Sequence, residues 1–304
     1  MAVKTWSTPV SVLEASRLVP CALCGGETFL PRFASGAFRQ NRVTGRALPR
    51  AEAGRDGFSY VRCVRCGLVQ INPQPIPADV AARYGTRYGK DYLAYELENE
   101  SAFLRLQELA LRDAGFFDLE KAGGPGSALD IGCATGALLS LLKNRGWTVR
   151  GVEISRPQAE YCRSRGLAVS GVPLEENRFP PECFDAVSAS HLIEHLNDPG
   201  AFVREIHRLL KKGGRFYVTT PNISGFQARL FGNAWRSAIF DHLYLFSRKT
   251  LSSLLESAGL YPERCVTWGG IAAGIAPKPI KALLDKNAKR FGFGDVMIIR
   301  AVKA

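Results

Sequence analysis

The sequence predicts an α/β protein with a doubly wound, mostly parallel sheet of seven strands, preceded by a small cysteine-rich domain. Two observations support this fold class. From residue 127 onward, short apolar strands alternate with helix-sized segments, and this order produces a parallel sheet that is covered on both faces. Ahead of them, four cysteines form two pairs of equal spacing, a pattern that indicates a small unit with its own fold.

The elements of the main domain follow from apolar patterning and from the residues that begin and end helices. The seven strands are predicted at residues 127–132, 148–154, 167–171, 184–191, 215–222, 260–268 and 294–302. Four helices are predicted between them, at residues 136–146, 155–166, 198–214 and 247–259. Gly146 and Gly166 end the first two helices, and Pro199 begins the third.

Composition places the chain among ordinary globular proteins. Its 304 residues are 46% hydrophobic and 22% charged, which is enough to bury a sizeable core. No apolar run approaches the roughly 18 residues of a membrane span. Glu14 and Arg17 interrupt the early stretch in which a secretory signal would need its apolar centre. We therefore expect a cytoplasmic protein without a membrane span.

Positive charge is concentrated toward the two ends of the chain, within a net charge of +12. Residues 21–66 contain eight arginines and three acidic residues, a net charge of +5. Residues 277–304 contain seven basic and two acidic residues, again +5. Such regions attract an anionic partner, either a nucleic acid or a phosphorylated metabolite, and a solvated surface is the alternative for any single residue.

The paired cysteines Cys21, Cys24, Cys63 and Cys66 form two C-x-x-C-G knuckles. Two sulfurs at positions i and i+3 of a tight turn point the same way, so two knuckles provide four thiolates for a closed, structural zinc site. A cytosolic chain favours metal over disulfides, with redox or free thiols as the alternative. We expect a zinc-ribbon-like domain over residues 1–70, a helical connector or lid over 71–124, and the main domain over 125–304.

A glycine-bearing turn, LDIGCATG at residues 129–136, follows the first strand of the main domain. It lacks the G-x-G-x-x-G spacing of dinucleotide-binding turns, and Asp130 would repel a pyrophosphate. S-adenosylmethionine fits better because it carries an ammonium and a sulfonium and has no phosphate. Asp130 would attract the ammonium, while Gly132 and Ala134 would let the backbone approach the ligand closely. Glu153, about 20 residues on, would accept hydrogen bonds from the ribose diol.

With these motifs, residues 125–304 resemble the class I S-adenosylmethionine-dependent methyltransferases. The resemblance lies in LDIGCATG, GVEIS, FDAVSASHLIEHL and LLKKGGRFYVTTPN. It implies a Rossmann-like fold and S-adenosylmethionine as the cofactor. The cofactor-binding residues predicted from the turn and from this resemblance are Asp130, Gly132, Cys133, Ala134, Gly136, Glu153, Ile154, Ser190 and His191.

A second resemblance concerns the catalytic base. Residues 240–247, FDHLYLFS, are similar to a stretch of zinc-containing sugar C-methyltransferases in which a Glu-His pair stands where Asp241 and His242 stand here. Those enzymes also place two cysteine knuckles and a tyrosine-rich connector ahead of the catalytic domain. We expect His242, oriented by Asp241, to take a proton from a hydroxyl or from a carbon beside a carbonyl, with an ordinary pKa near ~6.5 unless the site shifts it. A helix-capping role is the alternative for His242, and Tyr92 of the connector is a further candidate as part of a lid.

The predicted function is methyl transfer to oxygen or carbon of a small anionic acceptor, a sugar or nucleotide sugar, whose phosphates the basic ends would contact. One alternative is an RNA methyltransferase that binds ribosomal RNA through the basic cysteine-rich domain, since a net charge of +12 suits phosphate contacts. Another is a binding module with an inactive methyltransferase domain, against which the intact Asp130, Gly132, Gly136 and Glu153 speak. The sequence leaves the oligomeric state open.

Overall fold

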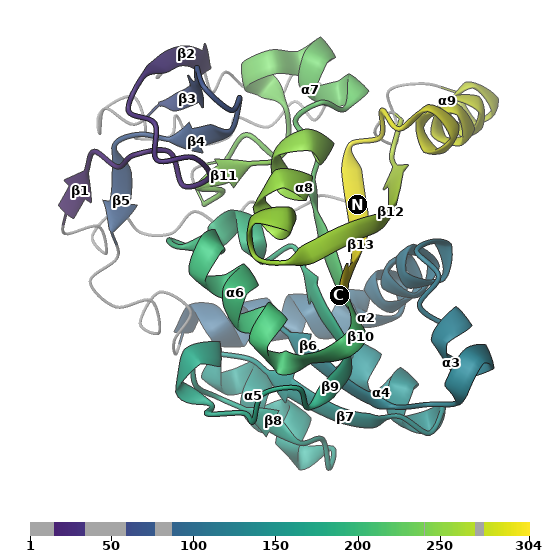
Figure 1. Ribbon diagram of the computed structural model, residues 1–304. Coiled ribbons are helices and arrows are strands. Elements are labelled where there is room, and N and C mark those ends of the chain that lie inside the picture. The colour runs from purple at the N-terminus through teal and green to yellow at the C-terminus, as the bar shows by residue number, and fades with distance from the viewer. Residues whose placement is uncertain (1–14, 34–58, 77–86, 240, 271–276) are drawn as a thin grey trace.

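Two sheets organise the computed structural model of the chain (Figure 1). The described residues are 15–33, 59–76, 87–239, 241–270 and 277–304. The larger sheet has seven strands and the smaller has four. Two further strands, β1 (Ala15–Arg17) and β5 (Gln74–Ile76), pair antiparallel. This architecture confirms the predicted α/β class with a separate small sheet near the N-terminus.

The seven-stranded sheet has the order β12-β13-β10-β9-β6-β7-β8. Its strands are β6 (Ser127–Ile131), β7 (Thr148–Val152), β8 (Val169–Ser170), β9 (Phe184–Ser190), β10 (Leu210–Pro221), β12 (Leu260–Trp268) and β13 (Val296–Lys303). Neighbours from β10 to β8 are parallel, and only β13 runs against both of its neighbours. Because β6 is flanked by β7 and β9, the strand order reverses there, and ligands of open α/β sheets bind at such a switch point.

Helices cover both faces of this sheet (Figure 1). They are α2 (Arg87–Asp113), α3 (Asp118–Gly123), α4 (Ala137–Asn144), α5 (Arg156–Ser164), α6 (Pro199–Leu209), α7 (Phe226–Phe231), α8 (Arg248–Ser257) and α9 (Lys278–Phe291). Successive strand residues serve opposite cores, since Leu129 packs in the cluster containing residues of α6 and α8, and Ala128 in the cluster containing residues of α2 and α4. Short 3-10 helices span Leu174–Glu176, Ile193–His195 and Gly232–Ala234.

The predicted strands and helices are present, with one boundary wrong and two helices missed. The helix predicted over 198–214 ends at Leu209, because Leu210 is extended and pairs with Phe184 of β9 as the start of β10. Neither α7 nor α9 was predicted. None of the helices in the described residues is both long and apolar enough to cross a membrane.

The smaller sheet has the order β11-β4-β3-β2 and is antiparallel throughout. Its strands are β2 (Phe29–Phe33), β3 (Tyr60–Cys63), β4 (Val69–Ile71) and β11 (Tyr244–Leu245). The strand β11 belongs to the second half of the chain, so the cysteine-bearing sheet is completed by the main domain. The predicted boundaries at residues 70 and 124 stay a prediction.

Candidate active site and metal centre

The turn after β6 depends on backbone angles that most residues avoid. The φ angle is +72° at Gly132, +50° at Ala134 and +72° at Gly136. Gly132 N donates a hydrogen bond to the carbonyl of Val152 at 2.8 Å, which joins the turn to the end of β7. The left-handed conformation of Ala134 is uncommon for a residue with a side chain, and such outliers concentrate at functional sites.

Gly136 offers a test of how tightly this turn packs. A methyl group added there would lie 2.5 Å from Leu167 Cδ1 and 2.9 Å from Cys162 Sγ. We expect Gly136→Ala to lower the free energy of unfolding by about 1–3 kcal/mol through overpacking, in addition to the cost of its φ angle. Gly166→Ala is the matched control, since its φ is +71° with nothing within 4 Å of the added methyl. Urea unfolding that gives both variants the same loss would contradict this account of the packing.

Asp130 lies at the end of β6, where only 2% of its surface is exposed. Ser188 Oγ on the neighbouring strand β9 donates a hydrogen bond to Asp130 Oδ1 at 2.6 Å. Burial raises the pKa of Asp130 to about 7, against the lowering effect of the Ser188 bond. A cationic group bound nearby would return this carboxyl to its ionised form, so the position suits the ammonium of S-adenosylmethionine.

Glu153 follows β7 and is hydrogen-bonded to the backbone of the turn. Its Oε2 accepts a hydrogen bond from Ala134 N at 3.0 Å, and its Oε1 accepts one from Ser155 N at 2.8 Å. Burial raises the pKa of Glu153, while these two backbone donors lower it. Each carboxylate oxygen has a second lone pair, so Glu153 can also accept from the two hydroxyls of a ribose.

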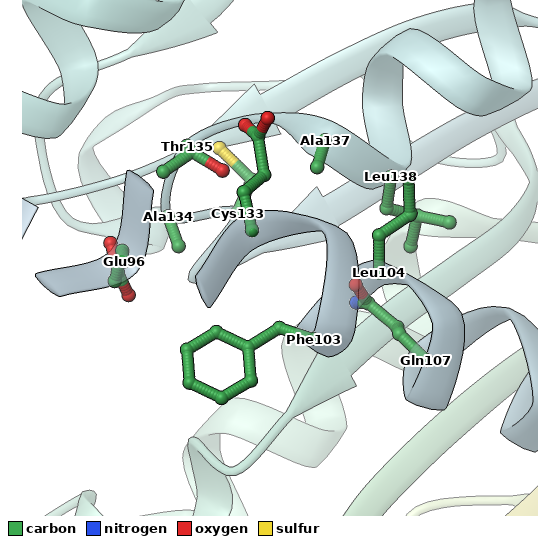
Figure 2. A pocket seen from close by; sticks show the side chains of 10 residues that line it. Glu96, Phe103, Leu104, Gln107, Cys133, Ala134, Thr135, Ala137 and Leu138 are labelled. Carbon is green, nitrogen blue, oxygen red and sulfur yellow. The ribbon is translucent and has the colours of Figure 1, made fainter. Parts of the chain in front are cut away.

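A further carboxylate, the buried Glu96 of α2, faces the same turn and was not among the residues predicted from the sequence. Figure 2 shows it beside a small cavity that α2 and the turn enclose. Glu96 is 7% exposed, and its Oε2 has no hydrogen-bond partner among the described residues. Burial and the charge of Glu153 raise its pKa to about 7. The sequence around Glu96 does not indicate that its side chain lies near the turn, because this position depends on how α2 packs over residues 133–138.

The other predicted cofactor residues differ in how exposed they are. Cys133 is 5% exposed and packs in a small core with Leu139 and Cys162, and it also lines the cavity. Ile154 and Ser190 are half-buried and His191 is exposed. His191 has a φ of +53°, and its N donates to the Thr219 carbonyl at 2.9 Å.

Beside the turn lies a cluster of Glu194, His195 and His242. One carboxylate oxygen and one ring nitrogen of each histidine lie within 4.8 Å of one another. Glu194 is fully buried, and its Oε2 accepts from Thr220 Oγ1 at 2.9 Å. The segment after β9 that carries Glu194 contacts the turn, since a methyl group added at Gly132 would lie 3.8 Å from Leu192. The sequence singled out His242 but not Glu194 as its neighbour.

Backbone carbonyls fix the tautomers of both histidines. His242 Nδ1 lies 2.8 Å from the Ser237 carbonyl oxygen, and His195 Nδ1 lies 2.8 Å from that of Asp241. A carbonyl can only accept, so each Nδ1 carries the proton and each neutral ring keeps its lone pair on Nε2. The Ser237 carbonyl therefore holds the ring of His242, and the orienting role of the Asp241 side chain stays a prediction.

The site also sets the charges of this cluster. Burial and the adjacent His195 lower the pKa of His242 to about 4, so the ring is neutral at pH 7. This is below the ordinary value near ~6.5 that the sequence suggested. Burial raises the pKa of Glu194, but the three neighbouring histidines outweigh it and lower that pKa to about 2. The cluster thus combines an imidazole able to accept a proton with a carboxylate able to stabilise the resulting cation.

Tyr92, the third predicted catalytic residue, lies in α2 and is 37% exposed. Its ring stacks against Tyr95 with 6.3 Å between centroids, and its hydrogen bond to Glu96 lowers the pKa of that carboxyl. Tyr92 is thus connected to the cofactor side of the site through Glu96.

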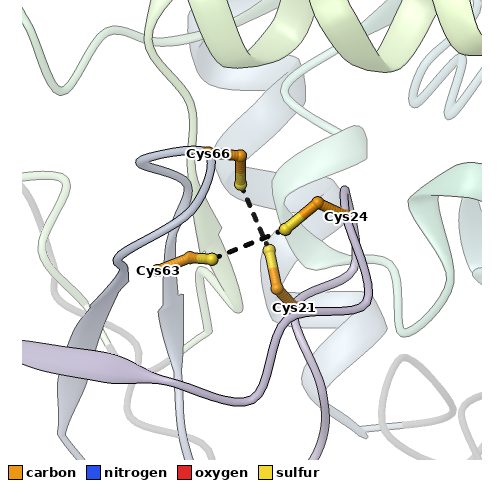
Figure 3. A group of neighbouring side chains, drawn as sticks. All are labelled: Cys21, Cys24, Cys63 and Cys66. Carbon is orange, nitrogen blue, oxygen red and sulfur yellow. Dashed lines mark hydrogen bonds between the residues drawn. The ribbon is translucent and has the colours of Figure 1, made fainter.

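The four paired cysteines converge as predicted (Figure 3). Their sulfurs lie within 4.8 Å of one another, with Sγ of Cys21 3.4 Å from Sγ of Cys66 and Sγ of Cys24 3.6 Å from Sγ of Cys63. Burial raises the pKa of Cys63, but hydrogen bonds from the Cys66 and Arg65 backbone and from neighbouring thiols lower it to about 7. Burial raises the pKa of Cys21 and of Cys66, and four sulfurs gathered at this spacing fit a metal ion, which would favour their thiolate forms.

Four of the seven basic residues of the C-terminal region form ion pairs with acidic neighbours. Ion pairs join Lys281 to Asp285, Lys289 to Asp113, Arg300 to Glu263 and Lys303 to Glu182. Five of the eight arginines counted in residues 21–66 lie outside the described residues.

A seven-stranded Rossmann-like sheet with Asp130 and Glu153 beside a glycine turn at its switch point is the arrangement expected of an S-adenosylmethionine-dependent methyltransferase. Residues 100–264 match a family model described as a methyltransferase domain, and the chain belongs to this family. Its cofactor is thus S-adenosylmethionine, and Asp130, Glu153 and the turn fit that compound.

Named relatives share the methyltransferase region. The ubiquinone biosynthesis O-methyltransferase of Pseudomonas paraeruginosa is 31% identical over 134 residues, which is 41% of this chain and 57% of that protein. The protein of the same name from Pseudomonas putida is 29% identical over 133 residues, which again is 41% of this chain and 57% of that protein. The chain thus spans little more than half the length of these curated relatives. A Thermotoga maritima structure, described as a possible histamine N-methyltransferase, has 27% identity and a TM-score of 0.49 over 70% of this chain and 98% of that chain.

Proposed function

We propose that this methyltransferase acts on oxygen or carbon of a small anionic acceptor, a sugar or nucleotide-sugar-like compound, with His242 as the general base. The observation that carries the proposal is the neutral His242 ring with its lone pair on Nε2, grouped with Glu194 and His195. A base in this state can accept a proton at neutral pH without first losing one.

The residues of the site divide the work of methyl transfer. Asp130 holds the ammonium of the cofactor and Glu153 its ribose hydroxyls, with Ile154, Ser190 and His191 completing the binding surface. Held by these residues, S-adenosylmethionine would supply a methyl group activated by the positive sulfur, which would keep the electrons of the broken S–C bond when the acceptor takes the methyl carbon. The acceptor's proton passes to Nε2 of His242.

Neighbouring groups keep His242 in the form that this step requires. The Ser237 carbonyl holds Nδ1–H at 2.8 Å, which leaves Nε2 free to accept the proton. The Glu194 carboxylate then stabilises the imidazolium that forms. Tyr92, at the edge of α2, would help to exclude water from the sulfonium, and Asp241 would contribute to the orientation of His242.

A small acceptor is favoured over RNA. Four of the seven basic residues in the C-terminal region are engaged in ion pairs, whereas nucleic-acid binding depends on many cationic contacts with phosphates. The curated relatives are O-methyltransferases by name, which supports oxygen as the acceptor atom.

Incubation with methyl-labelled S-adenosylmethionine and separate panels of nucleotide sugars, glycans and ribosomal RNA tests the proposal. We expect label in a nucleotide sugar or related small anion. Transfer to RNA, together with RNA affinity that falls steeply with salt, would overturn the assignment in favour of the RNA alternative.

We also propose that the four-cysteine centre binds zinc. Four thiolates at this spacing suit a tetrahedral structural site, and metal binding of this kind is coupled to folding. Purified protein is expected to contain one zinc per chain, and Cys63→Ser to lose both the metal and the order of the small sheet. Cys265→Ser, at a half-buried cysteine on β12, is the matched control. Elemental analysis that finds no zinc in chelator-free preparations would refute this proposal.

A further inference from the structure

The small sheet is connected to the His242 segment, defined here as residues 241–245. The strand β11 within this segment pairs antiparallel with β4, with Tyr244 opposite Gln70 and Leu245 opposite Val69. Ile71 N donates a hydrogen bond to the Leu243 carbonyl at 2.9 Å. The backbone that directly follows His242 is therefore an edge strand of the cysteine-bearing sheet.

Tyr60 connects the same sheet to the backbone of His242 itself. This residue begins β3, three positions before Cys63, and is 2% exposed. Its hydroxyl lies 2.7 Å from the carbonyl oxygen of Ile239 and 2.7 Å from that of His242. Both carbonyls can only accept, so the single hydroxyl proton is shared between them.

The second cysteine knuckle, from Cys63 to Cys66, connects β3 to β4. Cys63 ends β3, and the knuckle up to Cys66 leads into β4, closed by a bond from Cys63 N to the Leu68 carbonyl at 2.9 Å. Buried Cys21, Cys63 and Leu68 also share one apolar cluster with Leu243 and Tyr244. Order in the cysteine centre is thus transmitted to the His242 segment by strand pairing, by the Tyr60 bonds and by packing.

The main domain fixes the opposite side of this segment. His195 Nδ1 donates to the Asp241 carbonyl at 2.8 Å, and Tyr244 Oη donates to the Asn197 carbonyl at 3.1 Å. The His242 segment is consequently held between the two parts of the protein. Loss of either set of contacts would leave one side of it unsupported.

We propose that the four-cysteine metal centre positions the catalytic histidine, and that Tyr60 is one of the residues through which it does so. The centre then does more than stabilise the small sheet, because that sheet in turn positions His242. The effect on turnover rests on the function proposed for His242, whereas the effect on the order of the segment does not.

The full-length zinc-loaded protein and its Tyr60→Phe variant test this. The variant removes one hydroxyl, so we expect one zinc per chain and S-adenosylmethionine affinity within about two-fold of wild type. Amide exchange in residues 241–245 and diethyl pyrocarbonate modification of His242, read by mass spectrometry, should each rise at least about ten-fold. Turnover should fall about ten-fold at unchanged KM for S-adenosylmethionine. Tyr261→Phe, at an exposed tyrosine of β12, should leave all four measurements unchanged.

Chelation of zinc from the wild-type protein should raise the same exchange and modification rates. If amide exchange in the His242 segment and modification of His242 stay at wild-type rates in both the Tyr60→Phe variant and the metal-free protein, the proposed positioning is wrong. Loss of protection with full turnover would instead support the contact and refute His242 as the base.

Discussion

Replacing His242 by alanine is expected to lower turnover by roughly 10²–10⁴-fold, because a positioned general base contributes about that much. Affinity for S-adenosylmethionine should stay close to wild type, since Asp130 and Glu153, the residues proposed to bind the cofactor, belong to other elements. Single-turnover transfer of labelled methyl at saturating cofactor measures the chemical step. His207→Ala, at a half-buried histidine on α6, is the control and should retain full activity.

The pH dependence of the same reaction provides an independent check on His242. Its pKa is lowered to about 4, so the ring is neutral and able to accept a proton at every pH above that value. Wild-type turnover should therefore show no histidine-dependent loss between pH 8 and 5, and should fall only as pH approaches 4. Asp241→Asn should cause a smaller loss than His242→Ala. If the folded alanine variant keeps turnover within a few-fold of wild type, His242 is a structural residue.

Removing the charge of Asp130 is expected to weaken S-adenosylmethionine binding by about 1.5–3 kcal/mol, which is roughly 10- to 150-fold. Asp130→Asn preserves the shape of the side chain but loses its attraction for the ammonium. Glu153→Ala should weaken binding by a similar amount, because it removes the acceptor for the ribose hydroxyls. Calorimetric titration measures both, with Asp118→Asn on the exposed helix α3 as the control.

Binding should also depend on pH through Asp130. Its pKa is raised to about 7 in the free protein, so the carboxyl is increasingly protonated below that pH. A cation binds the ionised form, and binding therefore releases a proton when the pH is at or below about 7. Affinity should rise with pH up to about 7 and then level off, and Asp130→Asn should weaken this dependence. Unchanged affinity in both the Asp130 and Glu153 variants would place the cofactor elsewhere.

Local patterns in the sequence were sufficient for most of the fold and for the cofactor turn. The strand at 127–131 and the turn beyond it combine an apolar run, a terminal Asp130 and two glycines within eight residues, so their geometry depends on neighbours in the chain. The cysteine group was predictable for the same reason, because each C-x-x-C-G knuckle determines its own turn. Helix α9 was missed because its charged, lysine-rich surface resembled a solvated tail.

The features that could not be predicted depend on contacts between distant residues. Glu96 lies 57 positions from Glu153 in sequence, and only the packing of α2 brings the two carboxylates together. The Ser237 carbonyl that holds His242 was not predicted, because the sequence offers the adjacent Asp241 as the obvious partner. The pairing of β11 with β4 joins residues more than 170 positions apart, and no local pattern indicates it.

The central claim is that the turn between Asp130 and Glu153 holds a cationic adenosine compound. Calorimetric titration of the wild-type protein with S-adenosylmethionine and, in a separate experiment, with NAD tests this claim most directly. The account predicts saturable binding of one S-adenosylmethionine per chain, with proton release near pH 7 and no heat from NAD. Saturable NAD binding that S-adenosylmethionine fails to displace would contradict it.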